Sequence, residues 1–125
     1  MLRFVFVVCQ VADRDTCPAT KVQLLMQYRE ERDILVADDL ESILTSHPQR
    51  VSMHVALSRP PAGWARDAPR AREFARVEGY LRPDVFERAL AAPGPGTLVC
   101  LCGSGGFCTR MKASLEGMGY ATFVF

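Results

Sequence analysis

A glycine turn set between an apolar run and an amphipathic segment is the stretch of this 125-residue sequence best suited to chemistry. Residues 98–102 are apolar, residues 103–106 read Gly-Ser-Gly-Gly, and residues 109–117 have an amphipathic pattern. This order predicts a buried strand that ends in a glycine turn, which in turn opens a helix. Ligands of open α/β sheets bind beyond the carboxyl ends of such strands, where glycine lets the backbone approach closely. We therefore expect any binding site to have this turn at its rim.

Thiols surround the same turn. Cys100, Cys102 and Cys108 flank it, and Cys9 and Cys17 lie near the start of the sequence. An odd number of cysteines argues against a disulfide framework. The paired Cys-x2-Cys or Cys/His spacing of a zinc site is absent, so we interpret these residues as small apolar thiols and expect no metal.

Composition and charge describe an ordinary globular domain. Hydrophobic residues make up 49% of the sequence and charged residues 23%, and the net charge is +1. That charge gives no reason to expect a nucleic-acid partner, and the apolar run 4–8 is too short to span a bilayer. We expect one domain, 1–125, without a membrane segment and located in the cytoplasm, or at the cytosolic face of a membrane through segments outside this sequence.

Apolar runs and helical patterns alternate along the chain, which predicts an α/β fold with a mainly parallel sheet. Residues 1–11 suit either a strand or a helix packed on a sheet, and residues 62–78 form a long connection in which 70–76 can make a turn of helix. The fingerprint G-x-G-x-x-G fails, because its third glycine falls on Cys108. The expected strands are 22–28, 51–57, 98–102 and 121–125, and the expected helices are 36–47, 83–90 and 105–117.

Four blocks, in order, resemble the NAD(P)H-binding half of cytochrome b5 reductase-like enzymes, in the ferredoxin-NADP reductase superfamily. The resemblance implies a Rossmann-like half of the ferredoxin reductase type, with helices on both faces of the sheet. It also implies that the flavin-binding barrel and a first strand with its glycine loop lie outside this sequence, and it favours a helix for residues 1–11. The blocks are 31–35 (ERDIL) with Leu40-Glu41, 57–64 (LSRPPAGW), 98–103 (LVCLCG) and 123–125 (FVF).

What this resemblance implies is hydride transfer from NADH or NADPH to FAD, and then electron transfer to a haem or iron–sulfur protein such as cytochrome b5. FAD is expected only together with the flavin-binding domain, missing here or supplied by another chain. Cys102 would act by contact with the nicotinamide ring and not as a nucleophile, and Phe125 would face the flavin. The same corner supplies the implied cofactor-binding residues Gly103, Ser104, Gly105 and Phe107.

The adenosine side of the cofactor falls, by the same resemblance, on other strand ends. Ser58 and Arg59 match the ribose position, where an arginine can pair with a 2′-phosphate, and Tyr80 matches an aromatic ring near adenine. Tyr28 and Arg29 replace an asparagine and a polar residue of the family. The choice between NADH and NADPH stays open.

Alternative interpretations accompany each of these assignments. Cys102 can be a structural thiol, Arg59 a solvated charge and Tyr80 an ordinary packing residue. His54 is interpreted as a satisfied core histidine, and Trp64 as a packing anchor for the long connection.

The chain departs from the family at residues 104–107, where rigid prolines give way to a looser loop. We therefore expect the isolated chain not to turn over. The alternative function is a non-catalytic nucleotide-binding or interaction module descended from the same fold. Without the family's central strand, a gap is expected between the strands that end near Tyr28 and Cys102, filled by residues 1–8, by a second copy in a homodimer, or by another partner.

Overall fold

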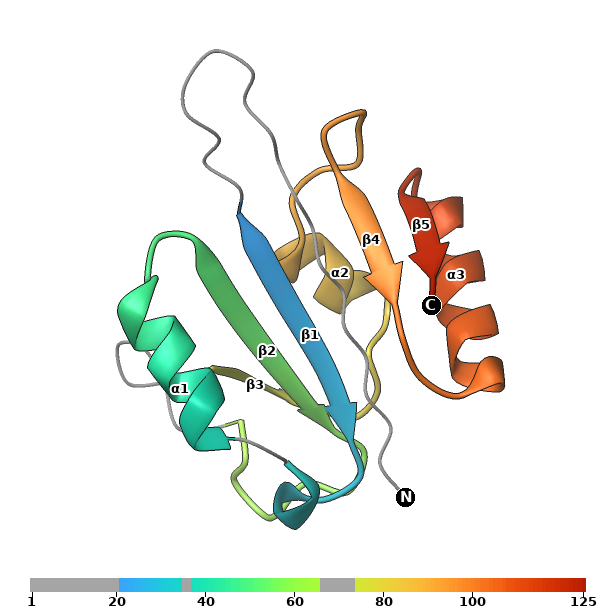
Figure 1. Ribbon diagram of the computed structural model, residues 1–125. Coiled ribbons are helices and arrows are strands. Elements are labelled where there is room, and N and C mark those ends of the chain that lie inside the picture. Colours follow the sequence, from blue (N-terminus) through green and yellow to red (C-terminus); the bar gives the residue numbers. More distant parts are fainter. Residues whose placement is uncertain (1–20, 35–36, 66–73) are drawn as a thin grey trace.

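The computed structural model describes residues 21–34, 37–65 and 74–125 (Figure 1). The expected helix or strand at residues 1–11, the loop at 13–20 and most of the expected helical turn at 70–76 lie outside these described residues. The elements are, in order, β1 (Val22–Tyr28), the 3₁₀ helix η1 (Glu31–Asp33), α1 (Ala37–Ser46), β2 (Val51–Leu57), β3 (Ala75–Glu78), α2 (Pro83–Ala89), β4 (Leu98–Leu101), α3 (Gly105–Gly117) and β5 (Ala121–Val124).

All strand pairs within the described residues are parallel. One sheet has the order β1-β2-β3, and a second sheet joins β4 to β5. β1 and β2 are in register from Val22 opposite Val51 to Tyr28 opposite Leu57. β1 and β4 lie next to each other in Figure 1 but belong to separate sheets, and no described strand pairs between them. The expectation that residues 1–8 fill this position concerns residues outside the described ranges.

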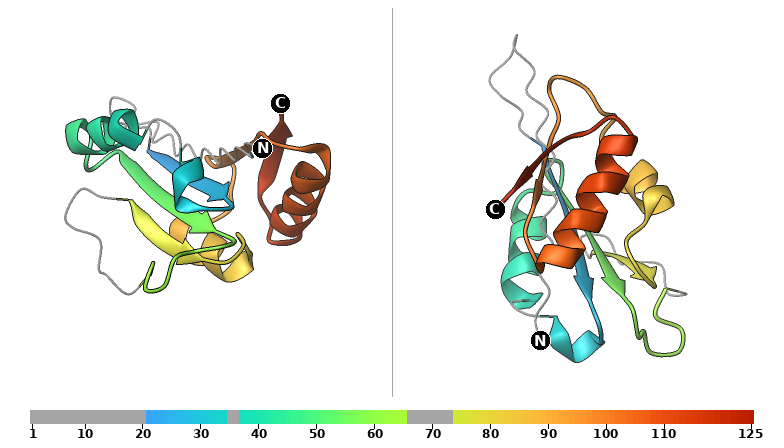
Figure 2. Two further views of the ribbon diagram at one scale, coloured as in Figure 1. Left: turned by 90° about the horizontal axis from the view of Figure 1, so that it is seen from below. Right: turned by 90° about the vertical axis from the view of Figure 1, so that its right-hand side faces the viewer.

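Helices cover both faces of the first sheet, as Figure 2 shows for α1 and α2. On one face, Leu24 and Met26 of β1 join Leu40 and Leu44 of α1 in a buried apolar cluster. On the other face, Leu25 of β1 joins a larger cluster that also includes residues of α2, β4 and α3. The alternation follows from the strand period of two, and burial on both faces explains why β1 reads as an apolar run.

α2 holds the two sheets together. Its Phe86 is fully buried and shares one core cluster with Leu25 of β1 and with Val99 and Leu101 of β4. Pro83 occupies the first turn of the helix, where its fixed φ is favourable and its missing N–H costs nothing. Figure 1 shows that β1, β2 and β4 run in the same direction, so their carboxyl ends lie on the same side of the molecule.

Three details correct or extend the expectations. Ala75 and Arg76, expected in a helical turn, belong to strand β3, which pairs with β2. Trp64 is confirmed as an anchor, because it is buried and the guanidinium carbon of Arg76 lies 4.7 Å from its ring centroid. Ile43, expected on the apolar face of α1, is 43% exposed. No helix among the described residues combines the length and apolarity needed to cross a bilayer.

Candidate functional site

A hollow of about 580 Å³ lies at the carboxyl ends of β1 and β2. Five of the residues expected to bind a cofactor line it, namely Tyr28, Arg29, Ser58, Arg59 and Tyr80. Its other lining residues are Gln27, Glu30, Arg32 and Asp33. The structure thus brings together Ser58, Arg59 and Tyr80, which the resemblance assigns to the adenosine side, with Tyr28 and Arg29, and these residues lie on three separate segments of the sequence.

The β1–β2 ladder continues past the ends of both strands and places two arginines side by side. The Ser58 N–H donates to the Tyr28 carbonyl at 3.0 Å, and the Arg59 N–H donates to the Arg29 carbonyl at 2.7 Å. Pro60 then ends the pairing, because proline has no N–H to donate. The backbones of Arg29 and Arg59 are therefore fixed against each other at the mouth of the hollow.

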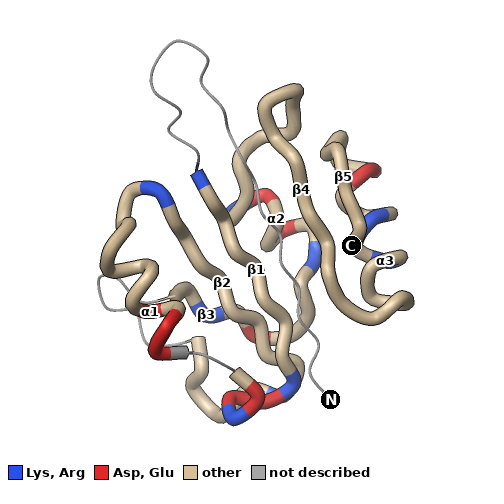
Figure 3. Tube along the Cα trace, in the orientation of Figure 1, with Lys and Arg blue, Asp and Glu red and all other residues tan. Residues whose placement is uncertain are grey.

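The acidic residues of the hollow are already engaged. Arg32 Nε lies 2.6 Å from Glu30 Oε2, and the Glu30 N–H donates to Asp33 Oδ2 at 3.1 Å as part of a capping box on η1. Figure 3 shows both charge signs at this end of β1. Within the described part of the chain, Arg29 and Arg59 form no ion pair. Two exposed guanidinium groups are left to meet an anion, and a phosphate fits their forked geometry.

Tyr80 and Tyr28 contribute differently to the hollow. The Tyr80 side chain is 64% exposed, so one face of its ring is open to a planar ligand. Tyr28 is 3% exposed and belongs to the buried apolar cluster between the first sheet and α1. Its hydroxyl lies 3.6 Å from Met26 Sδ. Stacking on a base is consequently open to Tyr80 and closed to Tyr28.

The other six predicted residues lie apart from the hollow, at the end of β4 and at the C-terminus. Cys102 follows β4 and is half-buried, and Gly103, Ser104 and Gly105 are exposed where α3 begins. Phe107 is 5% exposed and belongs to the larger buried cluster, with residues of α2 and β4, so its ring is not available to a cofactor.

The last residue of the chain lies beside this corner. The Phe125 N–H donates to the Leu101 carbonyl at 3.0 Å, one residue before Cys102. The Phe125 ring is 78% exposed and meets the Phe123 ring edge-on, with centroids 5.2 Å apart. The residues that the resemblance assigns to the nicotinamide side thus form a second group near the carboxyl end of β4, which lies on the same side of the molecule as the carboxyl ends of β1 and β2 (Figure 1).

Burial favours the neutral form of one thiol and one imidazole near the core. Burial, and to a lesser extent the neighbouring Cys102, raises the pKa of the Cys108 thiol, and Cys100, Cys102 and Cys108 are all free. Burial, and then the positive charge of Arg88, lowers the pKa of His54. The interpretation of His54 as a satisfied histidine is wrong, because its buried Nδ1 has no hydrogen-bond partner among the described residues.

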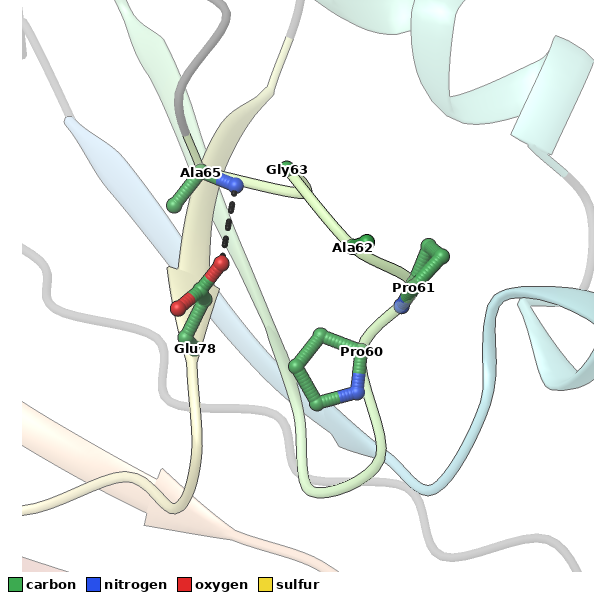
Figure 4. A pocket seen from close by; sticks show the side chains of 6 residues that line it. All are labelled: Pro60, Pro61, Ala62, Gly63, Ala65 and Glu78. Atoms are coloured by element: carbon green, nitrogen blue, oxygen red, sulfur yellow. Dashed lines mark hydrogen bonds between the residues drawn. The ribbon is translucent and has the colours of Figure 1, made fainter.

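A second hollow, of about 410 Å³, lies under the loop after β2 (Figure 4). Its polar side chain is Glu78, whose Oε1 accepts a hydrogen bond from the Ala65 N–H at 3.3 Å. Prolines, alanines and a glycine supply the rest of the lining. The bond from Ala65 attaches the loop to β3, and the remaining lining residues bring no side-chain polar group to recognise a ligand.

Sequence reasoning missed the polar residues that shape the first hollow. Gln27 is 5% exposed, and its amide bonds to three backbone carbonyls and one backbone N–H. A signal was present, because Gln23 and Gln27 stand four apart in an otherwise apolar strand. Both must lie on one face of it and find partners there.

A hollow with two guanidinium groups and an exposed aromatic ring, at the carboxyl ends of parallel strands, is typical of nucleotide-binding α/β domains. The family model described as "Oxidoreductase NAD-binding domain" matches residues 4–113. The chain belongs to this family of NAD-binding domains.

Similar proteins agree in their names. The chain is 32% identical over 108 residues to NADH-cytochrome b5 reductase 2 of Rattus norvegicus, covering 86% of this chain and 36% of the rat protein. It is 37% identical over 84 residues to the NADH nitrate reductase of Ulva prolifera, covering 67% of this chain and 9% of that protein.

A solved structure shows the same fold. The cytochrome b5 reductase domain of Ulva prolifera nitrate reductase superimposes with a TM-score of 0.74 at 31% identity, over 89% of this chain and 39% of that one. The chain therefore has the nucleotide-binding fold of the ferredoxin reductase type and is cytochrome b5 reductase-like. It spans about a third of the length of the rat reductase.

Proposed function

We propose that this chain binds NADH as the nucleotide module of a flavin-dependent reductase, with the adenosine half of the cofactor in the hollow between β1, β2 and Tyr80. The observation that carries the proposal is the meeting of Arg29, Ser58, Arg59 and Tyr80 around one hollow. Two of these segments, Ser58-Arg59 and Tyr80, are assigned by resemblance to the same half of one ligand, and Arg29, where the chain departs from the family, converges on the same hollow.

The groups in the hollow fit such a ligand chemically. The guanidiniums of Arg29 and Arg59 suit phosphate oxygens, the Ser58 hydroxyl suits a ribose hydroxyl, and the Tyr80 ring offers a stacking surface to adenine. NADH, when bound, supplies a hydride from its nicotinamide ring. In our proposal Cys102 and the exposed Gly103 backbone meet that ring by contact, and the Cys102 thiol takes no covalent part.

The relatives' names, which specify NADH, favour the unphosphorylated cofactor. The hollow nevertheless offers a 2′-phosphate two arginines, Arg29 and Arg59, and one of its two carboxylates, Glu30, is paired with Arg32. We therefore propose that NADH is the working cofactor, and that NADPH binds within about tenfold of it, a difference of about 1.4 kcal/mol.

We further propose that the hydride passes to FAD held by a separate flavin-binding domain, and that the electrons then pass to a haem protein such as cytochrome b5. The names of the relatives and the share of their length that this chain covers support this assignment. The exposed ring of Phe125 beside Cys102 is the surface we assign to the flavin side.

Titration of the chain with NADH and with NADPH, followed calorimetrically, tests the proposal. Saturable one-to-one binding of NADH supports it. Absence of binding by both nucleotides contradicts it, and the non-catalytic interaction module then becomes the better account. A ferricyanide assay with added FAD tests the second half, since we expect no turnover unless the flavin-binding domain is supplied.

A further inference from the structure

The side-chain amide of Gln27 lies between β1 and the turn that carries Tyr80. Gln27 Oε1 accepts a hydrogen bond from the Leu81 N–H at 2.8 Å, and Nε2 donates to the Gly79 carbonyl at 3.3 Å. Nε2 also lies 3.4 Å from the Ala56 carbonyl of β2. Because a backbone N–H can only donate, the Leu81 contact fixes which end of the amide is oxygen. One buried side chain thus bonds to the residues on both sides of Tyr80.

The turn itself depends on such support. Gly79 has φ +91°, a conformation that other residues adopt only with strain, and its N–H donates to the Leu57 carbonyl at 2.7 Å. On the solvent side, Arg82 Nη1 donates to the Tyr80 carbonyl at 3.1 Å. With its side chain 64% exposed, Tyr80 has little packing to fix its ring. The position of that ring therefore follows from the backbone that Gln27 and Arg82 hold.

We propose that Gln27 is a positioning residue for the nucleotide: it holds the 79–81 turn so that the Tyr80 ring stands at the rim of the hollow. Gln27 acts through Tyr80 and makes no contact with the reacting end of the cofactor. This inference rests on the proposed function, because it takes the ligand of the hollow to be the adenosine half of a nicotinamide dinucleotide.

The chain offers a matched control in Gln23, on the same face of the same strand. Gln23 Oε1 accepts a hydrogen bond from the Ala91 N–H at 2.8 Å, after the end of α2. Neither Gln23 nor Ala91 lines the hollow. The variants Gln27→Met and Gln23→Met each leave a backbone N–H without its side-chain acceptor. Gln27→Met frees the Leu81 N–H, before α2, and Gln23→Met frees the Ala91 N–H, after α2.

The experiment measures dissociation constants for two probes, ADP-ribose, which lacks the nicotinamide, and reduced nicotinamide mononucleotide, which lacks the adenosine. We expect Gln27→Met to weaken ADP-ribose binding by about tenfold, the size of one lost base–aromatic stack. Binding of the mononucleotide stays unchanged. Gln23→Met lowers the thermal unfolding midpoint but keeps both affinities. In a Tyr80→Ala background, Gln27→Met produces no further loss of ADP-ribose affinity.

Two results would overturn the inference alone, given wild-type binding of ADP-ribose: a folded Gln27→Met variant with unchanged affinity, or the same tenfold loss in the Tyr80→Ala background. Failure of the wild type to bind NADH and ADP-ribose overturns the proposed function and this inference together. If Gln27→Met does not fold, Arg82→Met loosens the same turn from solvent. A loss of about threefold for ADP-ribose alone then supports the inference, and an unchanged affinity overturns it.

Discussion

Removing the charge of Arg59, one of the two arginines at the mouth of the hollow, should weaken nucleotide binding, and the exposure of its side chain sets the size of the effect. Arg29 and Arg59 are exposed and without an ion pair in the described residues, and their backbones are joined by a 2.7 Å hydrogen bond. A charge-assisted bond to a phosphate contributes about 1.5–3 kcal/mol when buried, and exposure to solvent reduces it to about 0.5–1 kcal/mol. We therefore expect Arg59→Met to raise the dissociation constant for NADH about two- to fivefold.

The assay is calorimetric titration with NADH at two ionic strengths. The screening length falls from about 10 Å at 0.1 M salt to about 3 Å at 1 M, so the difference between the wild type and Arg59→Met should shrink at high salt. Lys112→Met is the control, because it makes the same change in net charge on α3, where Lys112 Nζ lies 3.9 Å from Glu116 Oε1. An Arg59→Met variant that binds NADH like the Lys112→Met variant at 0.1 M salt would refute the reasoning.

Three further predictions concern the core and the buried titratable groups. Phe86→Ala should lower the free energy of unfolding by about 3–5 kcal/mol in urea titrations, because it empties the junction of the two sheets, whereas Ile43→Ala on the exposed side of α1 should stay within about 0.5 kcal/mol. Burial lowers the pKa of His54, so the folded state binds fewer protons than the unfolded state, and stability should fall as the pH drops below about 6.5. Thermal scans of His54→Leu should show a flatter dependence over that range, and an equal slope would contradict this explanation. Iodoacetamide should label Cys102 before Cys108, whose pKa is raised by burial, and peptide mass spectrometry should find that bound NADH slows only the Cys102 reaction.

The sequence was a good guide to β1 and β2, whose bounds match the expected strands. Each is an apolar run stopped by a local signal, a charged turn after Tyr28 and a pair of prolines after Arg59. β3 was missed because its four residues include one buried apolar side chain, and its pairing with β2 is set by distant contacts. Local patterns cannot report such a strand.

The candidate site divides in the same way. The meeting of Ser58 with Tyr80 followed from the family resemblance and is present in the structure. The role of Gln27 depends on a hydrogen bond to Leu81, 54 residues away, which no local pattern encodes. The unpartnered Nδ1 of His54 likewise depends on which side chains fold over β2.

Mapping of backbone amide chemical shifts during an NADH titration tests the central claim most directly. Our account predicts the largest changes at Arg29, Arg59 and Tyr80, with a second group at Gly103 and Gly105. The nicotinamide-free probe ADP-ribose should reproduce only the first group. Shifts that leave the amides of Arg29, Arg59 and Tyr80 unmoved while NADH binds elsewhere would contradict the account.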